Sequence, residues 1–210
     1  MSVRLRWLAR QFARPSGMAG RLFIGAWLDR ISRSANRLAV SRLAPAKGEC
    51  ILEVGFGGGD LLSLLLAAEP AEVIGADASE AMVARASRRF ASEIGNGRLR
   101  LLHAPVESLA LADGAADAAV SVSSLYFWND LGAALNEMAR VVKGGGRVVL
   151  VWETPEKLRA WPGHLYGFNV YDESDVRRAA EAAGFQAFGA EREDGFIVLS
   201  LRRAADMEGA

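Results

Sequence analysis

Short apolar runs alternate with longer amphipathic stretches between residues 50 and 152, and this alternation is the feature that most constrains the fold. Five runs have the length and apolar character of buried strands, at 50–54, 73–76, 98–102, 117–122 and 147–152. Helical periodicity lies between them, at 60–68, 79–92 and 131–142. Strands that alternate with helices at this spacing predict βαβ units and a parallel sheet covered by helices on both faces.

The end of the chain follows a different pattern. A helix is expected over 172–183, with Asp172 as its N-cap and Gly184 as its stop. Two apolar runs at 186–190 and 196–201 then follow with no helix between them, and strands joined so closely pair antiparallel. We therefore predict an α/β fold built on a doubly wound sheet of seven strands, mostly parallel, with a C-terminal antiparallel hairpin.

Charge divides the chain at about Lys47. The whole sequence holds 25 basic and 25 acidic residues, but residues 1–47 hold ten basic groups and one acid, which gives +9 there and −9 in the rest. The basic part shows helical periodicity near 5–12, 20–32 and 36–44. We expect two regions: a basic N-terminal helical segment over 1–47, and an α/β domain over 48–210. The segment is interpreted as a lid or substrate cap; contact with an anionic membrane surface is an alternative, and nucleic-acid binding is disfavoured because the whole chain is neutral.

Composition excludes several classes of site. The single cysteine, Cys50, excludes an intrachain disulfide and a cysteine-built zinc site, and two histidines are too few for a His-rich metal cluster, so no metal is expected. No apolar run reaches the roughly 18 residues of a membrane span, and no signal-peptide core follows the basic start. A cytoplasmic protein is expected.

Glycine dominates the turn after the first expected strand, at Gly55, Gly57, Gly58 and Gly59. Such a loop bends sharply and lets a ligand approach the backbone, and the helix after it points its first amides at that ligand. No Gly-Lys-Ser/Thr triplet of a phosphate-binding loop is present. Asp60 stands where a dinucleotide fingerprint has its last glycine, and its charge would oppose a pyrophosphate, which disfavours a nicotinamide oxidoreductase.

An acid, Asp77, directly follows the second expected strand, 22 residues after Gly55. A carboxylate at this position can accept both hydroxyls of a ribose. The alternative is that Asp77 or Ser79 caps the next helix. The loop and the acid together predict a nucleoside ligand without a diphosphate.

In these motifs the sequence resembles the class I S-adenosylmethionine-dependent methyltransferases. The resemblance covers residues 36–202 and rests on 51–59, 75–82 and 141–148, in that order. It implies a Rossmann-like fold, S-adenosylmethionine as the cofactor, and methyl transfer to a small-molecule acceptor, apolar or lipid-like. The residues that it places around the cofactor are Glu53, Gly55, Phe56, Gly57, Gly59, Asp77, Ala78, Met82, Val106 and Ser123.

The same resemblance assigns parts of the cofactor to these residues. The glycine loop would lie against the methionine part with Glu53 near its amino group, Asp77 would hold the ribose, and Ala78 and Met82 would lie near the adenine. Pro105 stands where the family usually has the acid that receives the adenine amino group, which leaves the backbone of Val106 to reach the ring. This departure and the lack of an obvious base support an alternative, a non-catalytic methyltransferase-like module that binds a partner or a membrane surface.

The resemblance places the segment after the fourth strand, at 121–130, opposite the transferable methyl group. Tyr126, Trp128, His164 and Tyr166 are the candidates for the substrate pocket. The alternative for Tyr126, Phe127 and Trp128 is that they pack the loop against the core. His164 and Tyr126 are the catalytic candidates, His164 because an imidazole titrates near neutral pH; an exposed loop histidine is the alternative. No motif identifies the acceptor or the oligomeric state.

Overall fold

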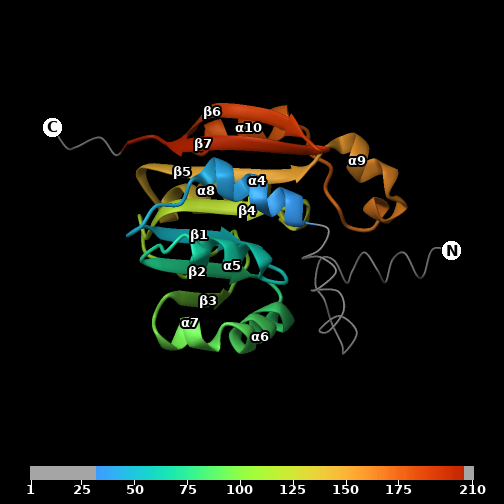
Figure 1. Ribbon diagram of the computed structural model, residues 1–210. Helices are drawn as coiled ribbons and strands as arrows, with labels where there is room; N and C mark the ends of the chain where they lie inside the picture. Colours follow the sequence, from blue (N-terminus) through green and yellow to red (C-terminus); the bar gives the residue numbers. More distant parts are fainter. Residues whose placement is uncertain (1–31, 206–210) are drawn as a thin grey trace.

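The computed structural model describes residues 32–205, which form a seven-stranded sheet in the order β3-β2-β1-β4-β5-β7-β6 (Figure 1). The strands are β1 (Cys50–Val54), β2 (Glu72–Asp77), β3 (Leu99–His103), β4 (Ala116–Val122), β5 (Val142–Glu153), β6 (Phe185–Glu193) and β7 (Phe196–Arg203). The first five are parallel, and β7 runs antiparallel to both β5 and β6. The prediction of a mostly parallel seven-stranded sheet with a C-terminal antiparallel hairpin is confirmed.

Helices cover both faces of the sheet (Figure 1). The described α-helices are α4 (Arg33–Leu43), α5 (Asp60–Ala67), α6 (Glu80–Arg89), α7 (Ala91–Gly95), α8 (Leu131–Val141), α9 (Pro155–Ala160) and α10 (Glu173–Ala182), with 3-10 turns η2 (Leu125–Phe127) and η3 (Pro162–Leu165). Apolar side chains of α4, α5 and α6 pack with Ile51 on one face, and those of α8 and α10 pack with Leu52 on the other. Both faces are therefore apolar, which explains why the strands read as continuous apolar runs.

Local sequence signals set several element ends. The Asp172 carboxylate accepts a hydrogen bond from Asp175 N (3.0 Å), and Asp175 accepts one from Asp172 N (3.2 Å), so the predicted N-cap of α10 is confirmed as a capping box. The β6–β7 hairpin turns at Asp194 and Gly195, whose φ angles of 52° and 76° suit a type I′ turn.

The structure differs from the sequence prediction between β5 and α10, where α9 and η3 replace an expected loop. The Thr154 hydroxyl accepts a hydrogen bond from Lys157 N (3.3 Å), and Pro155 occupies the first helical position, where its fixed φ favours a helix. This cap-and-proline signal is readable in the sequence and was missed. As a result His164 lies in η3, a 3-10 turn, and not in an open loop.

Two boundaries also differ. The helix expected over 79–92 ends at Phe90 and restarts as α7. Strand β5 begins at Val142, five residues before the expected start, because Gly146 lets the chain continue beside β4: a Cβ on Gly146 would lie 2.8 Å from the Asp117 carbonyl oxygen. The helices expected near 5–12 and 20–32 fall outside the described residues, apart from Ser32.

No helix within residues 32–205 is both long and apolar enough to cross a membrane. In the same range, no group of three or more His, Cys, Asp or Glu side chains is placed to hold a metal ion.

Candidate functional site

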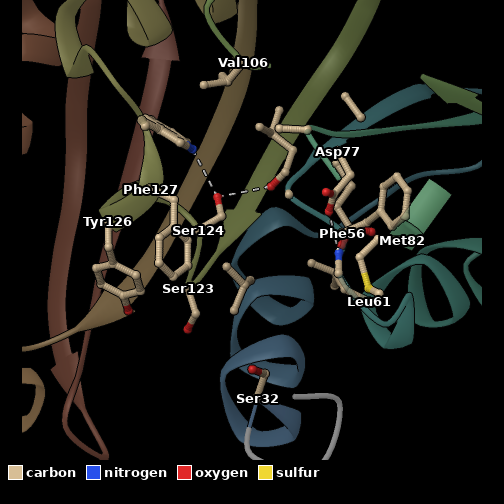
Figure 2. Close-up of a pocket in the computed structure, with 18 of the residues that line it drawn as sticks. Ser32, Phe56, Leu61, Asp77, Met82, Val106, Ser123, Ser124, Tyr126 and Phe127 are labelled. Carbon is tan, nitrogen blue, oxygen red and sulfur yellow. Dashed lines mark hydrogen bonds between the residues drawn. The ribbon is translucent and has the colours of Figure 1, made fainter. Parts of the chain in front are cut away.

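A cavity of about 700 Å³ opens at the carboxyl ends of β1, β2, β4 and β5. Its volume falls within the range of roughly 300–1,000 Å³ that is usual for small-molecule sites. The cavity spans the point where the strand order reverses between β1 and β4, which is where open α/β sheets bind ligands. Figure 2 shows two groups of lining side chains facing each other, with Asp77 in one group and Tyr126 in the other.

The glycine loop after β1 forms one wall. Gly55, Gly57 and Gly59 all have positive φ angles, of 76°, 51° and 84°, so the loop needs residues without a Cβ. A Cβ on Gly55 would lie 2.5 Å from Ser124 Cβ, and one on Gly59 would lie 2.9 Å from the Phe90 ring. A Cβ on Gly57 would meet no protein atom within 4 Å. Gly57 therefore leaves open space for a ligand, whereas the other two glycines permit close packing.

Asp77 lies at the end of β2 with both carboxylate oxygens fixed. Oδ2 accepts a hydrogen bond from Gly57 N (2.9 Å), and Oδ1 accepts one from Ser79 N (2.8 Å). The cap of α6 is Ser79, whose hydroxyl accepts from Met82 N (3.4 Å). Burial raises the pKa of Asp77, and the two backbone hydrogen bonds oppose that rise. Each oxygen retains a lone pair, so the carboxylate can still accept two hydroxyl groups from a ligand.

The wall beside Asp77 is mostly apolar. Met82 and Val106 line it with side chains that are 1% and 5% exposed, and Pro105 lies beside them. Glu107 connects this wall to the opposite one, because its Oε1 accepts hydrogen bonds from Asn129 N (2.6 Å) and Asp130 N (3.3 Å). The loop after β3 and the loop after β4 are thereby held together across the cavity.

The end of β4 is joined to β1 by hydroxyl groups. The Ser124 hydroxyl lies 2.5 Å from the Ser121 hydroxyl and 3.4 Å from the carbonyl oxygen of Val54. Trp128 Nε1 donates a hydrogen bond to the same Ser124 oxygen (3.2 Å), and this bond is drawn in Figure 2. This network fixes Trp128 beside the cavity and satisfies its indole N–H.

Four aromatic side chains form what we call the aromatic wall: Tyr126, Phe127, Trp161 and Phe168. The Phe168 ring lies 4.6 Å from the Phe127 ring, 5.2 Å from the Trp161 ring and 5.8 Å from the Tyr126 ring, measured between centroids. Trp161 and Phe168 come from the segment after α9 and are not among the residues predicted from the sequence. Asn169 N donates to the Tyr126 carbonyl oxygen (3.0 Å) and pins that segment to η2.

Glu153, at the end of β5, is another lining residue that sequence analysis missed. The Ser123 hydroxyl donates to its carboxylate, with distances of 3.2 Å and 3.4 Å to the two oxygens. The backbone N–H of Glu153 donates to the Tyr126 hydroxyl (2.8 Å). Burial raises the pKa of the Glu153 carboxyl, while nearby Lys157 and the Ser123 hydroxyl oppose the rise. In the sequence Glu153 reads only as the polar end of an apolar strand.

Acidic side chains predominate in the lining. They are Glu53, Asp60, Asp77, Glu107 and Glu153. Among the described lining residues the basic one is Lys157, whose Nζ lies 3.5 Å from the centroid of the Phe196 ring and donates to the Asp194 carbonyl oxygen (3.1 Å). This imbalance gives the cavity a negative potential that favours a cationic ligand.

Most of the site residues predicted from the sequence come together at this cavity. Those that line it are Glu53, Gly55, Phe56, Gly57, Asp77, Ala78, Met82, Val106, Ser123, Tyr126 and Trp128. Gly59, His164 and Tyr166 are not among the lining residues. His164 Nδ1 donates a hydrogen bond to the Trp161 carbonyl oxygen (2.6 Å), and this bond sets the orientation of the imidazole beside the η3 turn.

Comparisons with known proteins agree with this geometry. A family described as a methyltransferase domain matches residues 52–150. The uncharacterized methyltransferase YdaC of Bacillus subtilis is 29% identical over 156 residues, covering 74% of this chain and 81% of YdaC. The ubiquinone/menaquinone biosynthesis C-methyltransferase UbiE of Geotalea daltonii is 34% identical over 141 residues, 66% of this chain and 59% of UbiE.

A solved structure supports the fold. The geranyl diphosphate C-methyltransferase of Streptomyces coelicolor, in complex with S-adenosyl-L-homocysteine, superposes with a TM-score of 0.73 at 16% identity, over 93% of this chain and 87% of that one. At this level of identity the likeness concerns the arrangement of the sheet and helices. Of the two sequence relatives, this chain spans most of YdaC but less than two thirds of UbiE.

Proposed function

We propose that this chain, which belongs to the class I S-adenosylmethionine-dependent methyltransferases, transfers the methyl group of that cofactor to a small organic molecule. The observation that carries the proposal is that the glycine loop, Asp77 and the aromatic wall line one and the same cavity. One side of it offers hydrogen bonds suited to a nucleoside, and the other offers ring surfaces. A cofactor and an acceptor can therefore lie end to end within it.

The residues present fit the cofactor. Gly57 leaves space beside the loop, and the two Asp77 oxygens each keep a lone pair for a ribose hydroxyl. The sulfonium and ammonium groups of S-adenosylmethionine are positive, which suits the acidic lining, with Glu53 only 3% exposed. The buried Met82 and Val106 side chains offer apolar surface for the adenine.

When bound, this cofactor supplies a methyl group on a positively charged sulfur, so the leaving group is already activated. The contribution of the chain is then to align the acceptor and to exclude water. The aromatic wall does both, because its packed rings present an apolar surface and Asn169 fixes their position. Glu107 joins the loops after β3 and β4 by hydrogen bonds, which holds the two walls together.

The acceptor is proposed to be a small molecule with a substantial apolar or aromatic part. This follows from the aromatic wall, since rings stack on rings and gain free energy by removing apolar surface from water. The name of the Geotalea relative, a C-methyltransferase of ubiquinone and menaquinone biosynthesis, supports an acceptor of this general kind.

Isothermal titration calorimetry with S-adenosylhomocysteine and S-adenosylmethionine tests the proposal. We expect saturable binding of both, with dissociation constants near the micromolar range, about −8 kcal/mol. Asp77→Ala is expected to weaken binding severely. If neither compound binds the purified protein, the proposed function is wrong.

The basic N-terminal segment is proposed to be a lid over this cavity. Ser32 and Asn36, at the start of α4, line the cavity, so the described part of the chain begins at the cavity wall (Figure 2). Asn36 Nδ2 donates to Asp60 Oδ2 (3.1 Å), which ties this end of α4 to the helix after the glycine loop. We expect S-adenosylhomocysteine to slow tryptic cleavage at the arginines of residues 1–31; an unchanged cleavage rate would argue against a lid.

A further inference from the structure

We propose that Glu153 accepts the proton of the methyl acceptor, and that the acceptor is therefore a phenol-like molecule whose ring lies on the aromatic wall and whose hydroxyl faces Glu153. This inference rests on the proposed function. It adds a residue and a substrate class to it, because a hydroxyl group must lose a proton when it is methylated, whereas a tertiary amine or a thioether need not.

The position of Glu153 supports this role. Ser123 N donates to the Val151 carbonyl oxygen (2.8 Å), so the ends of β4 and β5 lie side by side, and Glu153 follows as a lining residue of the cavity. Its backbone N–H donates to the Tyr126 hydroxyl (2.8 Å), which ties it to the aromatic wall. In Figure 2, Ser123 and Tyr126 lie across the cavity from Asp77. The carboxylate is therefore at the end of the site away from the group that suits the ribose.

The local structure holds this carboxylate in place at some cost. Ser123 has a φ of 49°, a left-handed conformation that non-glycine residues adopt rarely, and its hydroxyl donates to Glu153 (3.2 Å). Backbone strain of this kind persists where the surroundings enforce it, and it concentrates at functional sites. Lys157, one turn into α9, is the cation nearest in sequence, but its ammonium is directed to the Asp194 carbonyl oxygen and the Phe196 ring.

Burial makes the Glu153 carboxylate a stronger base than an exposed glutamate. Its pKa is raised by burial, with Lys157 and Ser123 opposing the rise, so the carboxylate holds a proton more readily than an exposed glutamate does. Glu156 is the natural comparison. It lies three residues further on, exposed to solvent in the first turn of α9, and hydrogen bonds there lower its pKa.

The chemical step balances with the acceptor, Glu153 and the methyl group that S-adenosylmethionine supplies when bound. The acceptor hydroxyl donates a hydrogen bond to the Glu153 carboxylate, and its oxygen attacks the methyl carbon. A new carbon–oxygen bond forms as the carbon–sulfur bond breaks, and the electron pair of the broken bond remains on sulfur. The hydroxyl proton passes to Glu153. The products are a methyl ether, a neutral thioether and a protonated Glu153, which returns its proton to water.

The test uses 4-nitrophenol, whose absorbance reports its ionisation, with the full-length protein saturated with S-adenosylhomocysteine. We expect the wild type to bind the neutral phenol in preference to the phenolate, because a phenolate beside Glu153 would bring two negative charges together. Glu153→Gln should weaken binding of the neutral probe about tenfold, since a hydrogen bond to a charged group is lost, and should remove the preference for the neutral form.

Two controls separate the possible outcomes. Glu156→Gln removes a charge three residues away and should leave probe binding unchanged, and Glu153→Gln should still bind S-adenosylhomocysteine. If the wild type fails to bind S-adenosylhomocysteine, the proposed function itself is wrong. If that binding is normal but the probe does not bind, or binds Glu153→Gln as it binds the wild type, only the present inference is overturned.

A second measurement does not need the probe. Ser123→Ala removes a hydrogen bond to the charged form of Glu153, so it should raise the pKa of that carboxyl. The carboxyl carbon resonances of labelled glutamate follow this titration directly, and Glu153→Gln identifies the signal. A Glu153 pKa that does not respond to Ser123→Ala would show that the Ser123 hydroxyl does not position this carboxylate, and would overturn the arrangement on which the inference depends.

Discussion

Replacing Gly57 by alanine separates the role of the glycine loop in ligand binding from its role in folding. Gly57 has a φ of 51°, and a Cβ built on it meets no protein atom within 4 Å, so an added methyl group projects into open space at the cavity. The Gly57 N–H, which donates to Asp77 Oδ2 (2.9 Å), is retained in the variant. The substitution therefore adds only backbone strain to the free protein, but it occupies space that the proposed cofactor needs.

The two effects have different expected sizes. A non-glycine residue in the left-handed region costs roughly 1–2 kcal/mol, partly offset by the lower chain entropy of alanine in the unfolded state. We expect Gly57→Ala to lose about 1 kcal/mol of unfolding free energy, which lowers Tm by about 2–4 °C in a protein of this size. Binding of S-adenosylhomocysteine should weaken at least tenfold, about 1.4 kcal/mol, because the methyl group displaces the ligand from the loop.

Gly48→Ala is the matched control. Gly48 also has a positive φ, of 87°, and a Cβ built on it meets no protein atom within 4 Å. It precedes β1, at the amino ends of the strands, and does not line the cavity. Thermal unfolding should place both variants slightly below the wild type, and calorimetry should show normal affinity for Gly48→Ala alone. Wild-type affinity in Gly57→Ala would refute the assignment of this loop to the cofactor.

Three further predictions concern charged side chains. Asp77→Asn should weaken S-adenosylhomocysteine binding at least tenfold by calorimetry. The backbone N–H groups of Gly57 and Ser79 each donate to a different oxygen of Asp77, and an asparagine side chain has only one acceptor oxygen for the two of them. Glu153→Gln should be more stable than the wild type to urea at pH 7.5, and this difference in unfolding free energy should disappear near pH 4. The reason is that the pKa of Glu153 is higher in the native state than in the unfolded state. The unfolding free energy of the wild type therefore falls as pH rises between these two pKa values, by at most about 1.4 kcal/mol per pH unit. Arg147→Ala should lower the unfolding free energy by about 2 kcal/mol at neutral pH in urea, because the Arg147 guanidinium joins Glu49 (2.6 Å) to the end of α4. This loss should shrink on acidification, because Arg147 lowers the pKa of Glu49 in the native state.

The sheet could be predicted from the sequence because its information is local. A strand buried on both faces must be a short apolar run, and the helix between two parallel strands must carry an apolar stripe, so each of the first five strands was found within a few residues. The glycine loop and Asp77 were found for a similar reason. They lie where β1 and β2 end, and their residue types are required by backbone conformation and by hydrogen bonding.

The rest of the cavity depends on contacts that sequence spacing does not reveal. Trp161 and Phe168 come from the segment after α9, a helix that begins at the cap formed by Thr154 and Pro155, and Asn169 N holds that segment against Tyr126. His164, chosen for its chemistry, lies in the same segment but outside the lining. Residue type alone predicts a titratable group, whereas its place at the site is decided by the turn that carries it.

The pKa values of carboxyl groups are shifted in opposite directions at the two ends of the strands, and this contrast locates function better than residue type does. At the amino ends of the strands, the Arg147 guanidinium lowers the pKa of Glu49; for Asp117, burial acts to raise the pKa, but hydrogen bonds from Cys50 N and Lys143 outweigh it and the pKa is lowered. These groups stabilise the native state at neutral pH and lose that contribution on acidification. At the carboxyl ends, burial raises the pKa of Asp77 and Glu153, so their charge costs stability at neutral pH. A fold under selection for stability alone would have no reason to keep that cost, whereas a site that must bind hydroxyl groups and accept a proton requires both carboxylates.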